Sequence, residues 1–327
     1  MLSQQIRTAS LRSDRRSPLV IEPAGGLKDL SELLAARSRE TQEELLNHGA
    51  LLFRGFSVHT LDDFDAAIAA LNIERMDYVF GSTPRTALGK RIFSATEYPP
   101  AQDIPLHNEN AYQRSWPLKI ALSCLVPAAS GGETPLADMR AVGAILGDRV
   151  LNEFETRGVR YVRHYRPYID VPWQHVFGTT DRNEVARFCA EHAITCEWLD
   201  KETLRTTQDC QGTAQHPATG ERVFFNQAHL FHVSSLKAAA AKSLIQLYGI
   251  NGLPRHAVYH DGSEIPVETL QAVREAFSKA TISFPWQRGD VLLVDNMQFA
   301  HGRRPFKGAR QVIVALLQPY SAQHVRP

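Results

Sequence analysis

The chain has 327 residues, of which 43% are hydrophobic and 22% are charged. These values are typical of a globular protein and exclude a disordered or collagen-like chain. Lysine and arginine number 36 and aspartate and glutamate 35, and a formal net charge of +1 argues against a nucleic-acid-binding protein. We predict one domain over residues 1–327, because no linker rich in proline, glycine or serine divides the chain.

The sequence shows no membrane-spanning or secretion signal. No stretch approaches the roughly 18 to 20 apolar residues that span a bilayer. Residues 1–18 are basic and polar and lack the apolar core of a secretory signal, so we expect a polar N-terminal tail and no membrane partner. The chain has four cysteines and no C-x-x-C pair, which favours free thiols and a cytoplasmic location.

Predicted helices and strands alternate irregularly along the chain. Hydrophobic periodicity predicts helices over residues 30–46, 62–71, 236–248 and 267–277. Short apolar or alternating runs predict strands over residues 50–53, 120–126, 159–165, 222–225, 289–294 and 312–317. No strand–helix–strand rhythm is sustained, which argues against a doubly wound sheet. The pattern favours a mainly β fold with flanking helices.

Two histidines and a carboxylate are the first candidate site. His107 and Glu109 stand in the run IPLHNENAY, and on a strand residues i and i+2 point to the same face. His301 follows the predicted strand of residues 289–294, where the adjacent Gly302 would let it turn inward. Two imidazoles and one carboxylate bind one face of Fe(II) and leave positions for a chelating cosubstrate and O2. Zinc suits the same ligands.

Arg310 and Thr134 are candidates for holding such a cosubstrate. Arg310 opens the predicted strand RQVIVALLQP, which we expect to pair beside the strand that precedes His301. Its planar guanidinium can bind a carboxylate through two charge-assisted bonds, so a dicarboxylic ketoacid could chelate the metal and reach Arg310. The GGET motif permits a tight turn with positive φ, and the Thr134 hydroxyl could donate to the same ketoacid.

With these motifs, the sequence resembles the taurine dioxygenase/clavaminate synthase superfamily, most closely its syringomycin-pathway aspartyl hydroxylase-like branch. The resemblance covers roughly residues 50–318 and rests on PLHNENAY, SGGETPLADMRAV, TGERVFFNQAHLFHVSSL and FPWQRGDVLLVDNMQFAHGRRPFKGARQVIVAL. It implies a double-stranded β-helix (jelly-roll) core with helical insertions, and an enzyme that uses Fe(II), 2-oxoglutarate and O2. It also implies His107, Glu109 and His301 as iron ligands, and Thr134 and Arg310 as the 2-oxoglutarate-binding residues.

The retained carboxylate of Glu109 bears on the reaction. Related halogenases have alanine or glycine at this position, so the resemblance favours hydroxylation, with desaturation or epoxidation as alternatives, over halogenation. It implies an amino-acid or amino-acid-derived substrate in natural-product biosynthesis, either free or tethered to a carrier protein of a peptide synthetase. The loop YRPYIDVPW, with Pro167 and Pro172, departs from the glycine-rich run of the branch, and we expect it to border the substrate.

Several polar and aromatic residues are candidates for binding the substrate. They are Arg163, His164, Trp173, Asn226, Gln227, His229, Arg85 and Tyr112. The alternative is that Trp173 packs in the core, and that Asn226 and Gln227 satisfy backbone groups in a turn.

Two other classes of protein fit the same three ligands. A metal-dependent hydrolase that uses zinc would need neither Arg310 nor Thr134. A non-catalytic jelly-roll binding protein would tolerate Glu109→Ala. No pattern indicates the oligomeric state.

Overall fold

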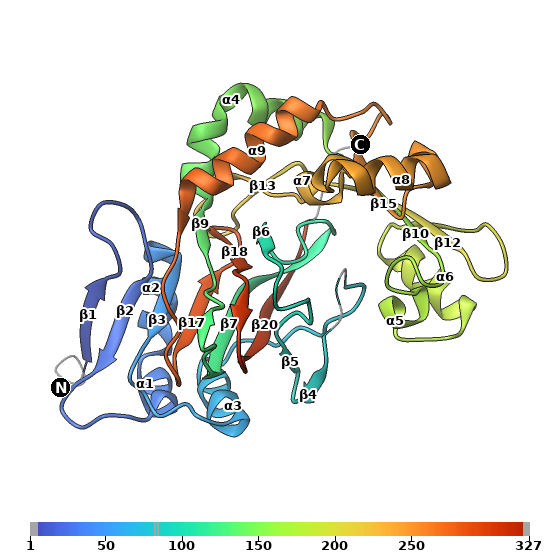
Figure 1. The fold of residues 1–327 in the computed structure, drawn as a ribbon. Helices are drawn as coiled ribbons and strands as arrows, with labels where there is room; N and C mark the ends of the chain where they lie inside the picture. The colour runs from blue at the N-terminus through green and yellow to red at the C-terminus, as the bar shows by residue number, and fades with distance from the viewer. Residues whose placement is uncertain (1–5, 82, 84, 323–327) are drawn as a thin grey trace.

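The structure is a computed structural model that describes residues 6–81, 83 and 85–322. An eight-stranded sheet runs through the centre of the protein (Figure 1). Its strands, in order across the sheet, are β1 (Ile6–Ser10), β2 (Leu19–Pro23), β3 (Ala50–Phe53), β17 (Val291–Asp295), β7 (Ser115–Val126), β20 (Gln311–Ser321), β5 (Ile92–Ser94) and β4 (Ala87–Gly89). A four-stranded sheet faces it. That sheet consists of β16 (Thr281–Ile282), β9 (Leu136–Asp138), β18 (Phe299–Arg303) and β6 (Ile104–His107).

Both faces of the large sheet are buried. On one face, Leu52, Ile120 and other apolar side chains pack against Phe299 of the smaller sheet. Helices α1 (Leu30–Ala36), α2 (Ser38–His48) and α3 (Leu61–Ala70) cover the other face, where Phe64 packs against Ile313 and its neighbours. Two facing sheets with helices around them confirm the predicted mainly β, jelly-roll fold.

A large insertion joins two adjacent strands of the smaller sheet. It runs from the end of β9 to the start of β16 and occupies the top and right of Figure 1. Its own sheet has the order β11 (Thr195–Trp198), β12 (Leu204–Cys210), β10 (Val159–Tyr165) and β15 (Arg255–Val258). Its helices are α4 (Met139–Arg157), α5 (Trp173–Phe177), α6 (Arg182–Glu191), α7 (Ala228–Phe231), α8 (Ala238–Tyr248) and α9 (Val267–Ala280).

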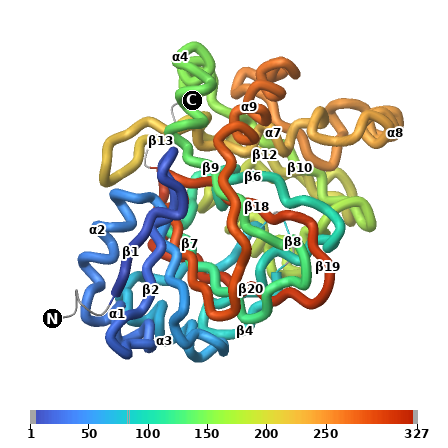
Figure 2. Tube along the Cα trace, turned by 60° about the vertical axis from the view of Figure 1, so that its left-hand side comes forward, coloured from blue at the N-terminus to red at the C-terminus, as the bar shows by residue number. Residues whose placement is uncertain are grey.

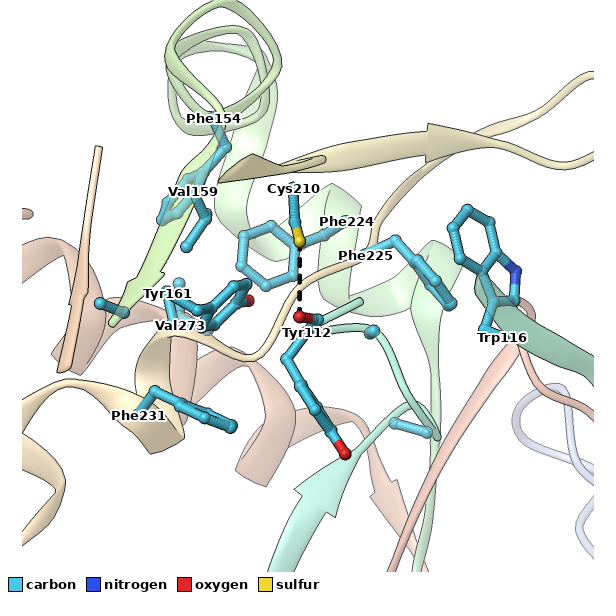
Figure 3. Close-up of a cluster of buried hydrophobic side chains, with 14 of the residues drawn as sticks. Tyr112, Trp116, Phe154, Val159, Tyr161, Cys210, Phe224, Phe225, Phe231 and Val273 are labelled. Carbon is cyan, nitrogen blue, oxygen red and sulfur yellow. Dashed lines mark hydrogen bonds between the residues drawn. The ribbon is translucent and has the colours of Figure 1, made fainter. Parts of the chain in front are cut away.

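An aromatic cluster fastens this insertion to the segment after β6 (Figure 3). Tyr112 of that segment packs edge-on against Tyr161 and beside Phe231. The Cys210 thiol donates a hydrogen bond to the Tyr112 carbonyl at 3.4 Å. These contacts hold one wall of the site described below.

The N-terminal segment is not the polar tail that we predicted. Strand β1 pairs antiparallel with β2, because the backbone groups of polar residues can hydrogen-bond whatever their side chains are. Arg16 extends from this hairpin to donate to the side chain of Gln298. Residues 1–5 of the predicted tail lie outside the described residues.

The predicted helix over residues 30–46 is broken into α1 and α2. Arg37 has φ −131° and ψ 31°, outside the helical region, and its N–H donates to the carbonyl of Leu33. The side chain of Ser38 donates to the carbonyl of Leu71, which anchors the new helix start. Helix α4 was not predicted, because Gly147 interrupts it with φ 74° and obscures its periodicity. No helix in the described part of the chain is long and apolar enough to cross a membrane.

Candidate active site

Two histidines face each other across β6 and β18. In the register of this antiparallel pair, His301 lies directly opposite His107, and side chains at such positions project to the same face. Their ring centroids are 4.6 Å apart. His301 lies within β18, a strand of its own, and not at the end of the preceding strand as we predicted. Strand pairing therefore brings the two imidazoles together.

Glu109 completes a cluster with the two histidines. Its Oε2 lies 3.7 Å from Nε2 of His301 and 4.0 Å from Nε2 of His107. Because β6 ends at His107, Glu109 lies on the following turn and not on the strand that we predicted. The buried side chain of Asn296 fixes this turn. Its Oδ1 accepts from the Glu109 N–H at 2.7 Å, and its Nδ2 donates to the Glu109 carbonyl at 3.0 Å.

Both imidazoles are held neutral, so each ring keeps a lone pair for a metal ion. Burial lowers the pKa of His107, and lowers the pKa of His301 well below its ordinary value. Nδ1 of His107 donates to the Pro105 carbonyl at 2.8 Å, which leaves the lone pair on Nε2, the atom facing Glu109. The three ligand atoms lie within 4.8 Å of one another. This donor set fits Fe(II).

Arg85 contacts the same carboxylate. Its Nη2 donates to Glu109 Oε2 at 2.7 Å, and both side chains are almost fully buried. Burial opposes the charge of Arg85, but the attraction of Glu109 outweighs it and raises the pKa of Arg85. The cluster therefore contains a cation beside the candidate metal ligands.

A narrow pocket of about 40 Å³ joins the two histidines to Arg310 and Thr134. Trp286 Nε1 donates to Thr134 Oγ1 at 3.0 Å, so the Thr134 hydroxyl proton is available to a ligand. Burial lowers the pKa of Arg310 to about 10, yet the group stays charged at neutral pH. The pocket thus holds a cation and a hydroxyl donor together with the two histidines, and these groups suit a dicarboxylic ketoacid.

The two glycines of the GGET motif allow close packing, because Gly131 lies against the Pro305 carbonyl and Gly132 lies against Arg310. Gly131 lies in β8 (Ser130–Gly131), which pairs with β19 (Phe306–Lys307), and the two strands run side by side in Figure 2. Both Gly131 and Gly132 have positive φ, at 70° and 75°. A Cβ on Gly132 would lie 3.0 Å from Cδ of Arg310, whose Nε donates to the Gly132 carbonyl at 3.0 Å. A side chain here would displace the guanidinium.

Strand β20, which follows Arg310, does not pair beside the strand that precedes His301, so that prediction was wrong. The twelve-residue strand β7 lies between β20 and β17 and pairs with both. Arg310 lines the same narrow pocket as the two histidines and lies just before the start of β20.

A larger cavity of about 610 Å³ meets the narrow pocket at the cluster. His107 and Arg85 line both spaces, and Glu109 lines the cavity. Its volume lies in the range of small-molecule sites. The proline-bounded loop contributes Ile169, Asp170 and Val171 to the wall.

The predicted substrate-binding residues divide into two groups. Arg85, Tyr112 and Gln227 line the cavity. The side chains that do not line it are those of Arg163, His164, Trp173, Asn226 and His229.

Packing and hydrogen bonds explain why three of these five side chains lie elsewhere. His164 makes a 2.8 Å hydrogen bond through Nδ1 to the Leu253 carbonyl. Trp173 packs edge-on against Trp198. Asn226 donates to the Gly212 carbonyl and accepts from the Ala228 N–H at the start of α7. The alternative that we gave for Trp173 and Asn226 therefore describes them better. Gln227 lines the cavity and also satisfies a backbone group, because its side chain donates to the Asn108 carbonyl.

Two features of the site were not predicted: the role of Asn296, and the ion pair of Asp170 with Arg255 on the cavity wall. Asn296 follows a buried strand directly, in the run VDNMQ, which was the available signal. No sequence signal pointed to Arg255, because an arginine at the start of a strand is more often exposed.

His229 is a buried structural histidine, and it should weaken the fold at acidic pH. Its Nε2 donates to the Leu106 carbonyl at 3.1 Å, and burial lowers its pKa from 6.5 to about 3. The unfolded chain therefore takes up the proton first, so stability present above pH 6.5 is lost as the pH falls toward 3. From this group we expect a loss of about 2 kcal/mol of unfolding free energy between pH 7 and pH 5.

Urea denaturation of the wild type and of His229→Gln at both pH values measures this effect. The variant should lose less stability than the wild type over that interval. Equal losses would show that His229 does not carry this part of the pH dependence.

Comparisons with known proteins show which proteins this chain is similar to. The model of the family "Taurine catabolism dioxygenase TauD, TfdA family" matches residues 15–317. The dapdiamide synthesis protein DdaC of Enterobacter agglomerans is 40% identical over 304 residues, which cover 90% of this chain and 92% of that protein. A clavaminate synthase-like protein of Arabidopsis thaliana is 30% identical over 318 residues, covering 91% and 93%.

Solved structures support the fold. The PvcB protein of Pseudomonas aeruginosa has a TM-score of 0.56 and 17% sequence identity, over 96% of this chain and 91% of that chain. Another structure of PvcB is named an Fe, alpha-ketoglutarate dependent oxygenase from an isonitrile synthetic pathway. At this identity the likeness concerns the arrangement of the chain.

Proposed function

The chain belongs to the TauD/TfdA family and is an Fe(II)- and 2-oxoglutarate-dependent dioxygenase, and from this premise we propose that it oxidises an unactivated C–H bond of an amino-acid-like substrate. Hydroxylation is the proposed outcome, with desaturation or epoxidation as the alternatives. The observation that carries the proposal is the position of the His107, Glu109 and His301 cluster, where the narrow pocket meets the larger cavity.

In this proposal, His107, Glu109 and His301 hold Fe(II), and Arg310 and Thr134 hold the distal carboxylate of 2-oxoglutarate. When bound, Fe(II), 2-oxoglutarate and O2 supply an oxidant for an unactivated C–H bond, with succinate and CO2 as the other products. The protein's own residues bind and orient the reactants.

Neighbouring residues support these roles. Asn296 fixes the backbone of Glu109 through two hydrogen bonds, and Trp286 orients the Thr134 hydroxyl. Leu122 and Val314 give the narrow pocket an apolar wall, which excludes water and strengthens the attraction between Arg310 and a carboxylate.

The substrate of the proposal is an amino acid or an amino-acid derivative in natural-product biosynthesis. A relative with 40% identity is named for dapdiamide synthesis, which supports a biosynthetic role. The cavity of about 610 Å³ has room for a free amino acid or for one presented on the arm of a carrier protein. A cytoplasmic location is also proposed, because all four cysteines are free thiols.

Glu109 favours oxygenation over halogenation. Its carboxylate occupies the position next to both imidazoles and has defined backbone and side-chain partners. A halide ligand would need that position to be empty.

The experiment that tests the function is a search for product by mass spectrometry. The protein would be given Fe(II), 2-oxoglutarate, O2 and amino acids, either free or as small pantetheine-like thioesters. We expect one of them to gain an oxygen atom or lose two hydrogens, with succinate formed in equal amount. Hydrolysed thioester with no oxidised product would contradict the proposal and favour the metal-dependent hydrolase.

A further inference from the structure

Arg85 is a buried arginine that borders both the narrow pocket and the cavity. Its side chain is 5% exposed, and Nη2 donates to Glu109 at 2.7 Å. Nε and Nη1 have no hydrogen-bond partner among the described residues. Buried polar groups are almost always hydrogen-bonded, and because Arg85 lines both spaces, these two donors are available to a ligand that enters them.

The charges of the assembled site leave Arg85 without a counterion. In the free protein, Glu109 balances it. In the proposed enzyme, Fe(II) and Arg310 together balance the Glu109 carboxylate and the two carboxylates of 2-oxoglutarate. Arg85 is then a buried cation with no anion assigned to it, and a buried charge is costly unless it is paired.

Among the described residues of the cavity wall, no second carboxylate is free to pair with this cation. Asp170 is the other carboxylate there, and Arg255 holds it through bonds of 2.5 and 2.6 Å. The Arg85 guanidinium lies over the ring of Tyr78, with Cζ 4.6 Å from the centroid, which fixes its plane. The anion that completes the site must therefore arrive with a ligand.

We propose that Arg85 binds a carboxylate of the substrate beside the metal position, and so selects acidic substrates over their neutral amides. This inference rests on the proposed function, because the charge balance places Fe(II) and 2-oxoglutarate in the site. The carboxylate belongs either to the main chain of a free amino acid or to the acidic side chain of an amino acid held as a thioester. Both sources present the same group to the guanidinium.

The test measures anaerobic binding to protein loaded with Fe(II) and 2-oxoglutarate. The probes are aspartate, asparagine, the α-amide of each, and the N-acetylcysteamine thioester of each. Binding is followed by calorimetry and by the change in the visible band of the iron chelate. Because charge-assisted hydrogen bonds contribute about 1.5 to 3 kcal/mol, we expect a carboxylate probe to bind about 10- to 100-fold more tightly than its amide.

Three variants assign this preference to a residue. Arg85→Gln should bring the carboxylate-to-amide ratio close to unity, while Arg85→Lys should retain most of it. The matched control is Arg163→Gln, because Arg163 is also buried with no hydrogen-bond partner among the described residues but does not line the cavity. It should keep the wild-type ratio. A preference that depends on the α-carboxylate indicates a free amino acid, and one seen between the two thioesters indicates a tethered substrate.

Three results would overturn the inference. One is a wild type that forms the iron chelate but binds acid and amide equally. Another is an Arg85→Gln variant that keeps the preference, and the third is a variant that loses only 2-oxoglutarate affinity, which would assign Arg85 to the cosubstrate. A wild type that forms no chelate would instead contradict the proposed function itself, and this inference with it.

Discussion

Replacing His301 with alanine is expected to abolish 2-oxoglutarate turnover, with a loss of at least about 100-fold, since even outer-shell partners of metal ligands contribute up to that factor. His301 lies opposite His107 in the strand register and supplies one of two neutral imidazoles. Its loss leaves one imidazole and one carboxylate, one ligand short of the facial triad that holds Fe(II). Turnover is measured as succinate formed, together with the iron bound after desalting.

A matched variant separates this loss from misfolding. His229→Gln removes another buried histidine, one that stacks on Phe277 and does not line either pocket. It should keep iron and turnover at neutral pH. If His301→Ala bound iron and turned over 2-oxoglutarate like the wild type, the proposed ligand set would be wrong.

Replacing Arg310 with glutamine should raise the 2-oxoglutarate concentration needed for half-maximal turnover by about 10- to 100-fold, with a smaller effect on the maximal rate. The guanidinium lines the narrow pocket and not the larger cavity proposed for the substrate, so it contributes binding more than chemistry. The measurement is succinate formation across a 2-oxoglutarate titration. The control is Arg304→Gln, which removes a half-exposed arginine near the same segment.

An unchanged 2-oxoglutarate requirement in Arg310→Gln would contradict the proposed binding of 2-oxoglutarate by Arg310. It would also favour a zinc-dependent hydrolase, which has no use for a cation at this position. Thr134→Val is a second check, because it removes the hydroxyl but leaves Trp286 in place. It should shift the requirement in the same direction by a smaller factor.

His107, Glu109 and His301 could be predicted from the sequence because they stand in short motifs of metal-binding residue types. The geometry that unites them could not. The spacing suggested that His107 and Glu109 share a strand face, but they do not. His107 instead faces His301 through strand pairing, and Asn296 holds Glu109 on a turn. Pairing between distant strands leaves no local pattern, and a lone asparagine after a strand has many possible uses.

The side chains that line the larger cavity were predicted less well, for a related reason. Alternation along β10 indicates that Arg163 and His164 point to opposite faces of its sheet, but it does not say which neighbours cover each face. Both faces turn out to be packed: Arg163 lies over the ring of Tyr165, and His164 bonds the Leu253 carbonyl. The insertion between β9 and β16 decides which side chains meet the cavity, and its folding depends on contacts across the whole chain.

The most direct test of the account is anaerobic addition of Fe(II) and then 2-oxoglutarate to metal-free protein. We expect a weak visible charge-transfer band in the wild type, unchanged by His229→Gln, weaker at a given 2-oxoglutarate concentration in Arg310→Gln, and absent in His301→Ala. A folded wild-type protein that binds Fe(II) but gives no band at saturating 2-oxoglutarate would contradict the placement of the cosubstrate between the cluster and Arg310.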